Sequence, residues 1–135
     1  FDKIFRALTL TVGGIAAISL VVAGIMIMNI MLVAVSNRHS EIGLLKALGA
    51  PRTQIMGLFL TESALLSITG AFLGFLLAYS AMKLLAGFLP EYNLALAPWS
   101  PVMASGLALG TGIIFGVLPA RRASLLEPAL ALSRR

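Results

Sequence analysis

Three long stretches without a charged residue constrain the fold more than any other feature of this chain. They cover residues 7–37, 63–82 and 92–120. A helix rises about 1.5 Å per residue, so about 20 apolar residues cross the roughly 30 Å hydrocarbon core of a bilayer. Only 11% of the residues are charged, against about a quarter in soluble domains. The sequence therefore predicts an all-α membrane protein with three transmembrane helices.

The charged residues between these stretches divide the chain of 135 residues into segments. Residues 7–37 alone would form a helix about 46 Å long, so the first helix is expected to begin outside the membrane as a stalk. No initiator Met precedes Phe1, from which we expect further sequence upstream. The predicted segments are a stalk and span at about 1–36, a short helix at about 38–50, a span at about 52–88, an outer loop at about 89–100, a span at about 101–120 and a tail at 121–135.

Basic residues are distributed unevenly between the two sides of the spans, three on one side and seven on the other. The positive-inside rule places the second group in the cytoplasm. We therefore expect a multi-pass protein of the cytoplasmic (inner) membrane with a cytoplasmic C-terminus. This topology also accounts for the net charge of +5, so no nucleic-acid partner is expected. The three are Lys3, Arg6 and Lys83, and the seven are Arg38, Lys46, Arg52, Arg121, Arg122, Arg134 and Arg135.

The short charged insert at 38–50 carries its own helix signals. Ser40 suits an N-cap, Glu41 suits the first turn of a helix, and Gly49 suits the left-handed position after its end. These signals predict a helix at about 41–48. Its leucine side can seat on lipid or on the bundle, whereas its small side would let another backbone approach closely. The leucine side holds Leu44, Leu45 and Leu48 with Ile42 at its margin, and the small side holds Gly43, Ala47 and Ala50.

Glu62 marks one boundary of the second span. Together with Lys83 it brackets one bilayer thickness, so we expect Glu62 near the cytoplasmic boundary rather than at the midplane. The predicted interaction is an ion pair with Arg38, Arg121 or Arg122. A solvated carboxylate and a role in ion handling are the alternatives.

Small residues recur at four-residue spacing in the second and third spans. This spacing stacks them on one helix face and is typical of close helix contacts in membranes. Asn29 in the first span can hydrogen-bond across helices or to its own helix backbone. The predicted packing residues are Asn29, Gly70, Gly74, Gly106, Gly110, Gly112 and Gly116.

The sequence shows no cluster of residues that would carry out chemistry. Cysteine is absent, His39 is the sole histidine, and no G-x-x-x-x-G-K-[ST] motif is present to cradle a nucleotide triphosphate. We therefore expect no catalytic residue, metal ligand or cofactor site in this chain. Any ATP hydrolysis would take place elsewhere.

Several segments, in this order and at this spacing, carry a resemblance to a known family. They are GGIAAISL (13–20), GIMIMNIMLV (24–33), SNRHSEIGLLKALGA (36–50) and GVLPARRAS (116–124), followed by Glu127-Pro128 and Ala131-Leu132. Together they resemble the FtsX-like permease domain of ABC transporters, especially the macrolide-exporter (MacB) type. The match covers nearly the whole of residues 1–135.

The resemblance implies a four-span permease, of which this chain holds the last three spans, with a first span and a large extracytoplasmic domain upstream. Such a module transmits ATP-driven motion of a nucleotide-binding domain, which holds ATP and Mg, to the outer domain. It serves efflux of drugs or peptides, or lipoprotein handling. Its implied partners are the ABC nucleotide-binding domain or subunit, a second permease copy and the lipid bilayer.

By the same resemblance, the insert is the coupling helix that enters a groove of the ATPase. The alternative function is a non-energised membrane scaffold, or a regulator of a cell-wall hydrolase, in which the insert lies on the lipid surface. The implied coupling residues are Arg38, Glu41, Ile42, Gly43, Leu44, Lys46 and Ala47.

Overall fold

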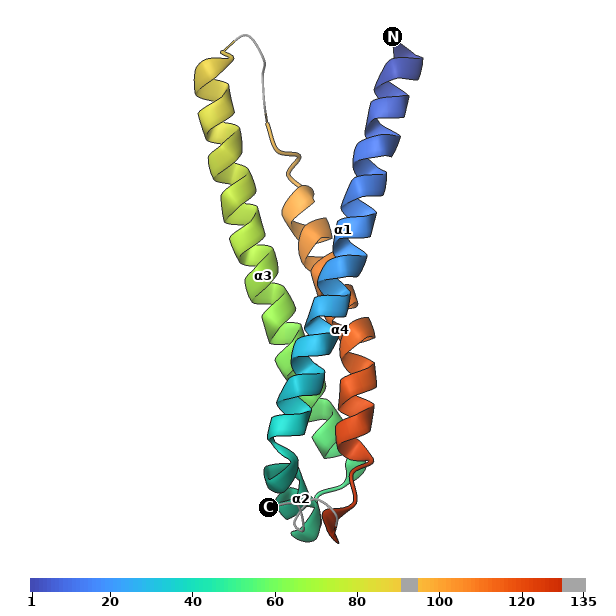
Figure 1. Cartoon of the computed structure of the whole chain (residues 1–135). Coiled ribbons are helices and arrows are strands. Elements are labelled where there is room, and N and C mark those ends of the chain that lie inside the picture. Colours follow the sequence, from blue (N-terminus) through green and yellow to red (C-terminus); the bar gives the residue numbers. More distant parts are fainter. Residues whose placement is uncertain (91–94, 130–135) are drawn as a thin grey trace.

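Four helices account for most of the protein. A computed structural model describes residues 1–90 and 95–129, and the remaining residues of the predicted loop and tail lie outside the described part. The helices are α1 (Asp2–Asn37), α2 (His39–Ala47), α3 (Arg52–Phe88) and α4 (Ser100–Ser124) (Figure 1). Helices α1, α3 and α4 are each long and apolar enough to cross a membrane. The predicted all-α membrane fold, with a short helix between the first and second spans, is confirmed.

Two of the helices are longer than a bilayer requires. Helix α1 has 36 residues and α3 has 37, so each is about 55 Å long against roughly 30 Å of hydrocarbon. Both therefore extend beyond the hydrocarbon core. Helix α4 has 25 residues and continues through Arg121 and Arg122, beyond the predicted end of its span at residue 120.

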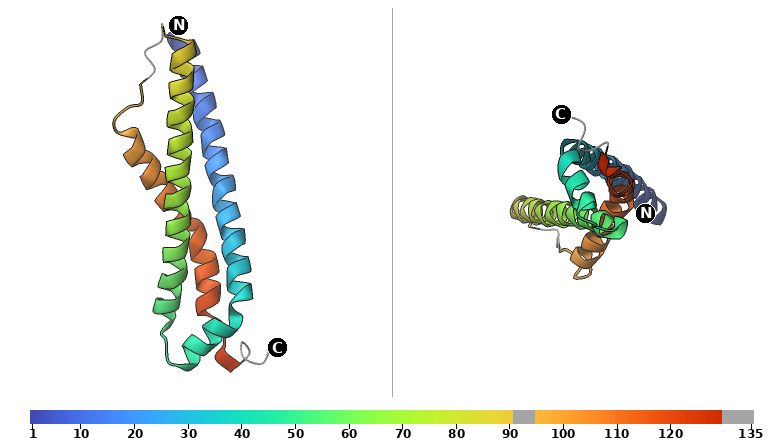
Figure 2. Two further views of the ribbon diagram at one scale, coloured as in Figure 1. Left: turned by 90° about the vertical axis from the view of Figure 1, so that its left-hand side faces the viewer. Right: turned by 90° about the horizontal axis from the view of Figure 1, so that it is seen from below.

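The three long helices converge at the end that carries α2 and diverge toward the N-terminus (Figures 1 and 2). Helix α4 packs on both α3 and α1, which barely touch each other. Helix α4 also bends, so that its first half leans away from α1 (Figure 2). Within it, the Thr111 hydroxyl donates a hydrogen bond to the Leu107 carbonyl at 2.7 Å, and Pro119 lacks the amide of a regular turn. Both features are common causes of helix bending.

The hydrophobic core lies entirely at the α2 end of the bundle. All four helices contribute to it, and Ala50 and Leu126 pack against its margin. In the diverging half, by contrast, large apolar side chains such as Phe5, Leu8 and Leu77 are exposed. The chain is therefore a V-shaped bundle with one packed end. The buried core residues are Met31, Val35, Ile42, Ile55, Phe59, Ala120 and Ala123.

Candidate functional site at the α2 end

Helix α2 is a short helix that turns the chain from α1 into α3. Its start differs from the prediction, because Arg38 occupies the N-cap position and Ser40 lies inside the helix without a capping hydrogen bond. Its end agrees with the prediction for Gly49, which has φ 94°. The amide of Gly49 bonds the Lys46 carbonyl and that of Ala50 bonds the Leu45 carbonyl, each at 3.0 Å. These two bonds form a Schellman motif, which fixes the direction in which α3 begins.

The buried side of α2 differs from either side of the predicted wheel. Ile42 belongs to the core, and Gly43 is buried beside it. The leucines that were expected to seat on lipid or on the bundle point outward, and Leu48 is 77% exposed. Ala47 is exposed as well, so the small side divides between the bundle and the outside. The outer surface of α2 is therefore formed by Glu41, Leu44, Leu45, Ala47 and Leu48.

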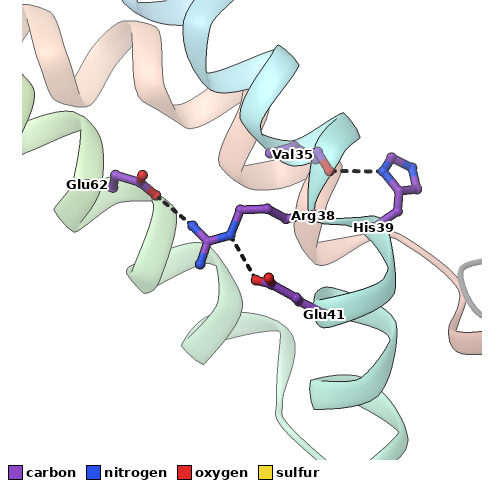
Figure 3. A network of polar contacts seen from close by, with 5 residues as sticks. All are labelled: Val35, Arg38, His39, Glu41 and Glu62. Carbon is purple, nitrogen blue, oxygen red and sulfur yellow. Dashed lines mark hydrogen bonds and ion pairs between the residues drawn. The ribbon is translucent and has the colours of Figure 1, made fainter.

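Arg38, at the junction of α1 and α2, joins two carboxylates (Figure 3). Its Nε donates to Glu41 Oε2 at 2.9 Å, and its Nη1 lies 3.5 Å from Glu62 Oε2. The hydrogen bond to Glu41, together with the charge of that carboxylate, raises the pKa of Arg38 above its ordinary value. Arg38 thus stays charged and connects α2 to α3.

The partner of Glu62 is therefore Arg38, the first of the three predicted candidates. Arg121 and Arg122 are exposed, and among the described residues neither lies within ion-pair distance of Glu62. The side chains of Arg38 and Glu62 are 42% and 41% exposed. Water therefore screens this pair, which makes it a boundary contact rather than a buried salt bridge.

Lys46 ties the other side of α2 to the segment that follows α4. Its ammonium group donates to the backbone carbonyl of Leu126, and the Leu126 side chain packs against the core. Partial burial lowers the pKa of Lys46, as does the charge of Arg52, while Glu127 acts in the opposite direction. Helix α2 is thus held by polar contacts on two sides, at Arg38 and at Lys46.

His39 closes the end of α1. Its Nδ1 lies 2.9 Å from the carbonyl oxygens of both Val35 and Ser36. Because a carbonyl only accepts hydrogen bonds, Nδ1 carries the proton in this arrangement. The contact satisfies carbonyls that the helix end leaves without an intrahelical partner.

Helices α3 and α4 approach most closely just above this site. A β-carbon on Gly112 would lie 2.8 Å from the Cβ of Ser67 and 2.9 Å from the Ser63 carbonyl, and one on Gly116 would lie 2.8 Å from the Cβ of Ser63. Only glycine fits at these two positions. Small residues on both helices thus bring α3 and α4 close together.

The other predicted packing residues have no such contact within the chain. A β-carbon would meet nothing within 4 Å at Gly70, Gly74, Gly106 or Gly110. Asn29 is exposed, and among the described residues its side chain makes no hydrogen bond, neither across helices nor to its own backbone. The four glycines leave open surface on α3 and α4, and Asn29 is exposed on α1.

A comparison with known protein families identifies the family of this chain. Residues 13–128, which include all of α2, α3 and α4, match the family described as FtsX-like permease C-terminal. The chain belongs to that family. The FtsX-like region thus contains both the short outer helix and the close α3–α4 contact.

Curated relatives with the same region are described as macrolide export ATP-binding/permease protein MacB. The chain is 46% identical over 129 residues to the protein of Rhodopseudomonas palustris (strain BisB18) and 40% identical over 129 residues to that of Agrobacterium fabrum (strain C58). In each case the similarity covers 96% of this chain and 20% of the relative. The chain thus spans about a fifth of the length of the relatives it matches.

The sequence analysis missed three residues that form close contacts between helices. Ser63 and Ser67 face Gly116 and Gly112, and a β-carbon on Gly24 of α1 would clash with the ring of Phe115 on α4. The serines stand at i and i+4, the same spacing as the glycines opposite them, so a search for any small residue at this spacing would have found them. The lone Gly24 offered no such signal. Among the described residues, no group of three or more His, Asp or Glu gathers that could hold a metal ion.

Proposed function

We propose that this chain is the membrane module of an ABC-type exporter, which transmits the motion of an ATP-hydrolysing domain through the membrane. The family match and the names of the relatives support the transporter class. The observation that carries the proposal is the outer surface of α2, where three leucines and Ala47 are exposed beyond the spans. A surface of this kind is covered when a partner groove receives the helix. By analogy with the relatives, the exported substrate is a macrolide-like drug.

The seven implied coupling residues divide into two roles in this proposal. Glu41, Leu44 and Ala47 lie on the outer surface of α2 and contact the ATPase groove. Ile42, Gly43 and Lys46 fasten α2 to the core and to the end of α4, and Arg38 fastens it to α3. Force applied to α2 therefore reaches three helices through side chains that are already in contact. The chain itself would hold no ATP or Mg and would hydrolyse nothing.

The diverging half would then move as a set of levers outside the cytoplasmic boundary. The open glycines at Gly70, Gly74, Gly106 and Gly110 leave room for close helix contacts there. We assign these faces to a further span of the same permease and to a second permease copy. The partners of the module are thus the ATPase, a second copy and the bilayer.

Orientation is the first requirement of this proposal, since an ATPase can grip only a cytoplasmic helix. Five described basic residues at the α2 end support this orientation, namely Arg38, Lys46, Arg52, Arg121 and Arg122. In a cysteine-free background of the full-length protein, a cysteine at Phe1 should react with an impermeant thiol reagent in intact cells. A cysteine at Thr53, which is exposed at the α2 end but lies outside the proposed docking surface, should react only after permeabilisation. Labelling of position 53 in intact cells would invert the topology and contradict the transporter proposal.

Substitution of Ala47 tests the docking surface. In the full-length protein, Ala47→Trp should abolish drug-stimulated ATPase activity at unchanged membrane levels, because a large side chain keeps the groove from closing on α2. Ala47→Ser is the matched control and should retain the activity. Normal stimulation in Ala47→Trp would show that this surface does not dock.

A membrane scaffold remains the second candidate, because the same leucines could rest on lipid. A fluorophore at Leu48 distinguishes the two. Quenching by brominated lipids in nanodiscs would favour the scaffold. Protection from these lipids, with a cross-link from position 48 to the ATP-binding region, would favour the exporter.

A further inference from the structure

A hollow of 410 Å³ lies at the α2 end, between the end of α1, the start of α2 and the end of α4. Its lining includes Leu32, Val35 and Ser36 of α1, His39 of α2, and Arg122 with Leu126. Its volume falls within the roughly 300–1,000 Å³ range of sites that bind small molecules. Neither the proposed ATPase contact nor the α3–α4 packing uses this space.

The hollow is separate from the ion pair described above. In Figure 3 the His39 ring lies on the opposite side of the α1–α2 junction from Glu62. Arg38, which contacts Glu62, does not line the hollow. The cation that does line it is Arg122, and no carboxylate of a described residue lies within ion-pair distance of Arg122. Arg122 therefore offers its full charge to a ligand.

The polar and apolar groups of the hollow come from different side chains. Arg122 has five N–H donors in a fork that suits the oxygens of a phosphate. His39 and Ser36 line the same hollow and add polar groups to it. Leu32, Val35 and Leu126 form an apolar wall. A ligand that fits has an anionic phosphate beside an apolar body.

The level of the hollow in the membrane identifies the source of such a ligand. Arg122 comes two residues after the uncharged stretch 92–120, and Ser36 lies at the end of the uncharged stretch 7–37. Both therefore stand where hydrocarbon gives way to headgroups. Basic pockets between transmembrane helices on the cytoplasmic side are suited to the headgroups of anionic lipids.

We propose that this hollow binds the headgroup of an anionic phospholipid, with the phosphate on Arg122 and the glycerol and upper chain against Leu32 and Val35. Bound there, the lipid would bridge α1, α2 and α4 and stabilise the packed end of the bundle. The proposal is independent of ATPase docking, because the hollow shares no residue with the outer surface of α2.

Native mass spectrometry of the full-length protein in detergent tests this site. The probes are phosphatidylglycerol, phosphatidylcholine with the same acyl chains, and inorganic phosphate. We expect phosphatidylglycerol to remain bound, phosphatidylcholine to bind at least fivefold more weakly, and inorganic phosphate not to displace the lipid. Arg122→Gln should weaken phosphatidylglycerol binding about fivefold, the effect of one basic side chain near an anionic lipid. Arg121→Gln is the matched control, an adjacent exposed arginine that does not line the hollow, and it should bind normally.

A second pair of variants tests the hollow without changing its charge, and each variant introduces the same large side chain. Ser36→Trp fills the hollow and leaves Arg122 in place, so it should also weaken binding, whereas Asn37→Trp, one residue outside the hollow, should not. Equal losses of phosphatidylglycerol binding in Arg121→Gln and Arg122→Gln would overturn the proposal, because binding would then depend on general surface charge. Unchanged binding in both Arg122→Gln and Ser36→Trp, or displacement by inorganic phosphate, would overturn it as well.

Discussion

The half of the bundle that carries α2 and the half that carries the N-terminus are built from the same three long helices, yet their side chains behave differently. Phe59 of α3 is 1% exposed at the α2 end, while Phe72 on the same helix is 62% exposed further along. In the sequence, both residues are flanked by apolar residues. Only Phe59 stands where all four helices meet.

The boundary charges suggest why the two halves differ. Glu62 and Lys83 bracket one bilayer thickness, and the core residues Ile55 and Phe59 lie on the α2 side of Glu62. On that side the bundle is surrounded by headgroups and water, so burial of apolar side chains in a core is favourable. Beyond Glu62 the neighbour is lipid, which solvates an apolar side chain as well as another helix does. We infer that the packed end faces headgroups and water and that residues 63–82 of α3, beyond Glu62, are surrounded by lipid.

Between the two halves lies the close contact of α3 with α4, which uses small residues instead of large apolar ones. Van der Waals contact drives helix association inside a bilayer, and small residues bring the backbones near enough for it. Gly112 and Gly116 meet Ser67 and Ser63 immediately inside the Glu62 level. Each mode of packing thus matches its surroundings.

Removal of a core aromatic ring should have the largest effect. Phe59→Ala should destabilise the full-length protein by about 3–5 kcal/mol, because the cavity opens in the packed half. Phe72→Ala, on the same helix in the open half, should change stability little. Thermal unfolding in detergent, followed by the loss of monodisperse protein, gives the comparison. Similar losses in the two variants would show that the open half is packed as well.

Replacement of Gly112 by a larger residue should have the second-largest effect. Gly112→Leu should cost about 1–3 kcal/mol, because its side chain collides with Ser63 and Ser67. Gly57→Leu, at an exposed position of α3 outside the proposed contact faces, meets open space and should leave the stability of the protein nearly unchanged. The same unfolding assay applies. Equal tolerance at both positions would mean that α3 and α4 do not approach at Gly112.

The boundary ion pair should give the smallest effect. A double-mutant cycle on Arg38→Gln and Glu62→Gln should return a coupling energy of about 0.2–1 kcal/mol that falls with salt, because both side chains are about 40% exposed. The cycle of Glu62→Gln with Arg121→Gln should return no coupling. Coupling to Arg121 instead of Arg38 would place α4, not the α1–α2 junction, beside Glu62.

The sequence predicted the transmembrane helices well because each contains a long stretch without charge. A helix must satisfy its own backbone in lipid, so residues 63–82 have few alternatives to forming one. Gly49 was equally predictable, since a left-handed residue after a helix favours glycine. These features depend on local chemistry alone.

What the sequence could not supply is how the helices are rotated and how far they stay together. The same glycine spacing occurs at Gly70 and Gly74 as at Gly112 and Gly116, but only the second pair lies where the helices converge. The choice of Arg38 over Arg121 for Glu62 depends on those rotations too. The rotation of α2 could not be predicted either. Its leucines point outward, and Ile42 packs it against the bundle.

Distances between spin labels in the full-length protein in nanodiscs test the two-halves account most directly. One pair, at Thr53 and Arg121, reports on the α2 end, and the other, at Leu8 and Phe88, reports on the diverging end. All four positions are exposed, and labelled protein is diluted with unlabelled protein so that distances within one chain dominate. The account predicts a narrow Thr53–Arg121 distribution that ATP leaves unchanged, and a broader Leu8–Phe88 distribution that shifts with ATP. A Thr53–Arg121 distribution that is as broad as the other, or that shifts more with ATP, would contradict it.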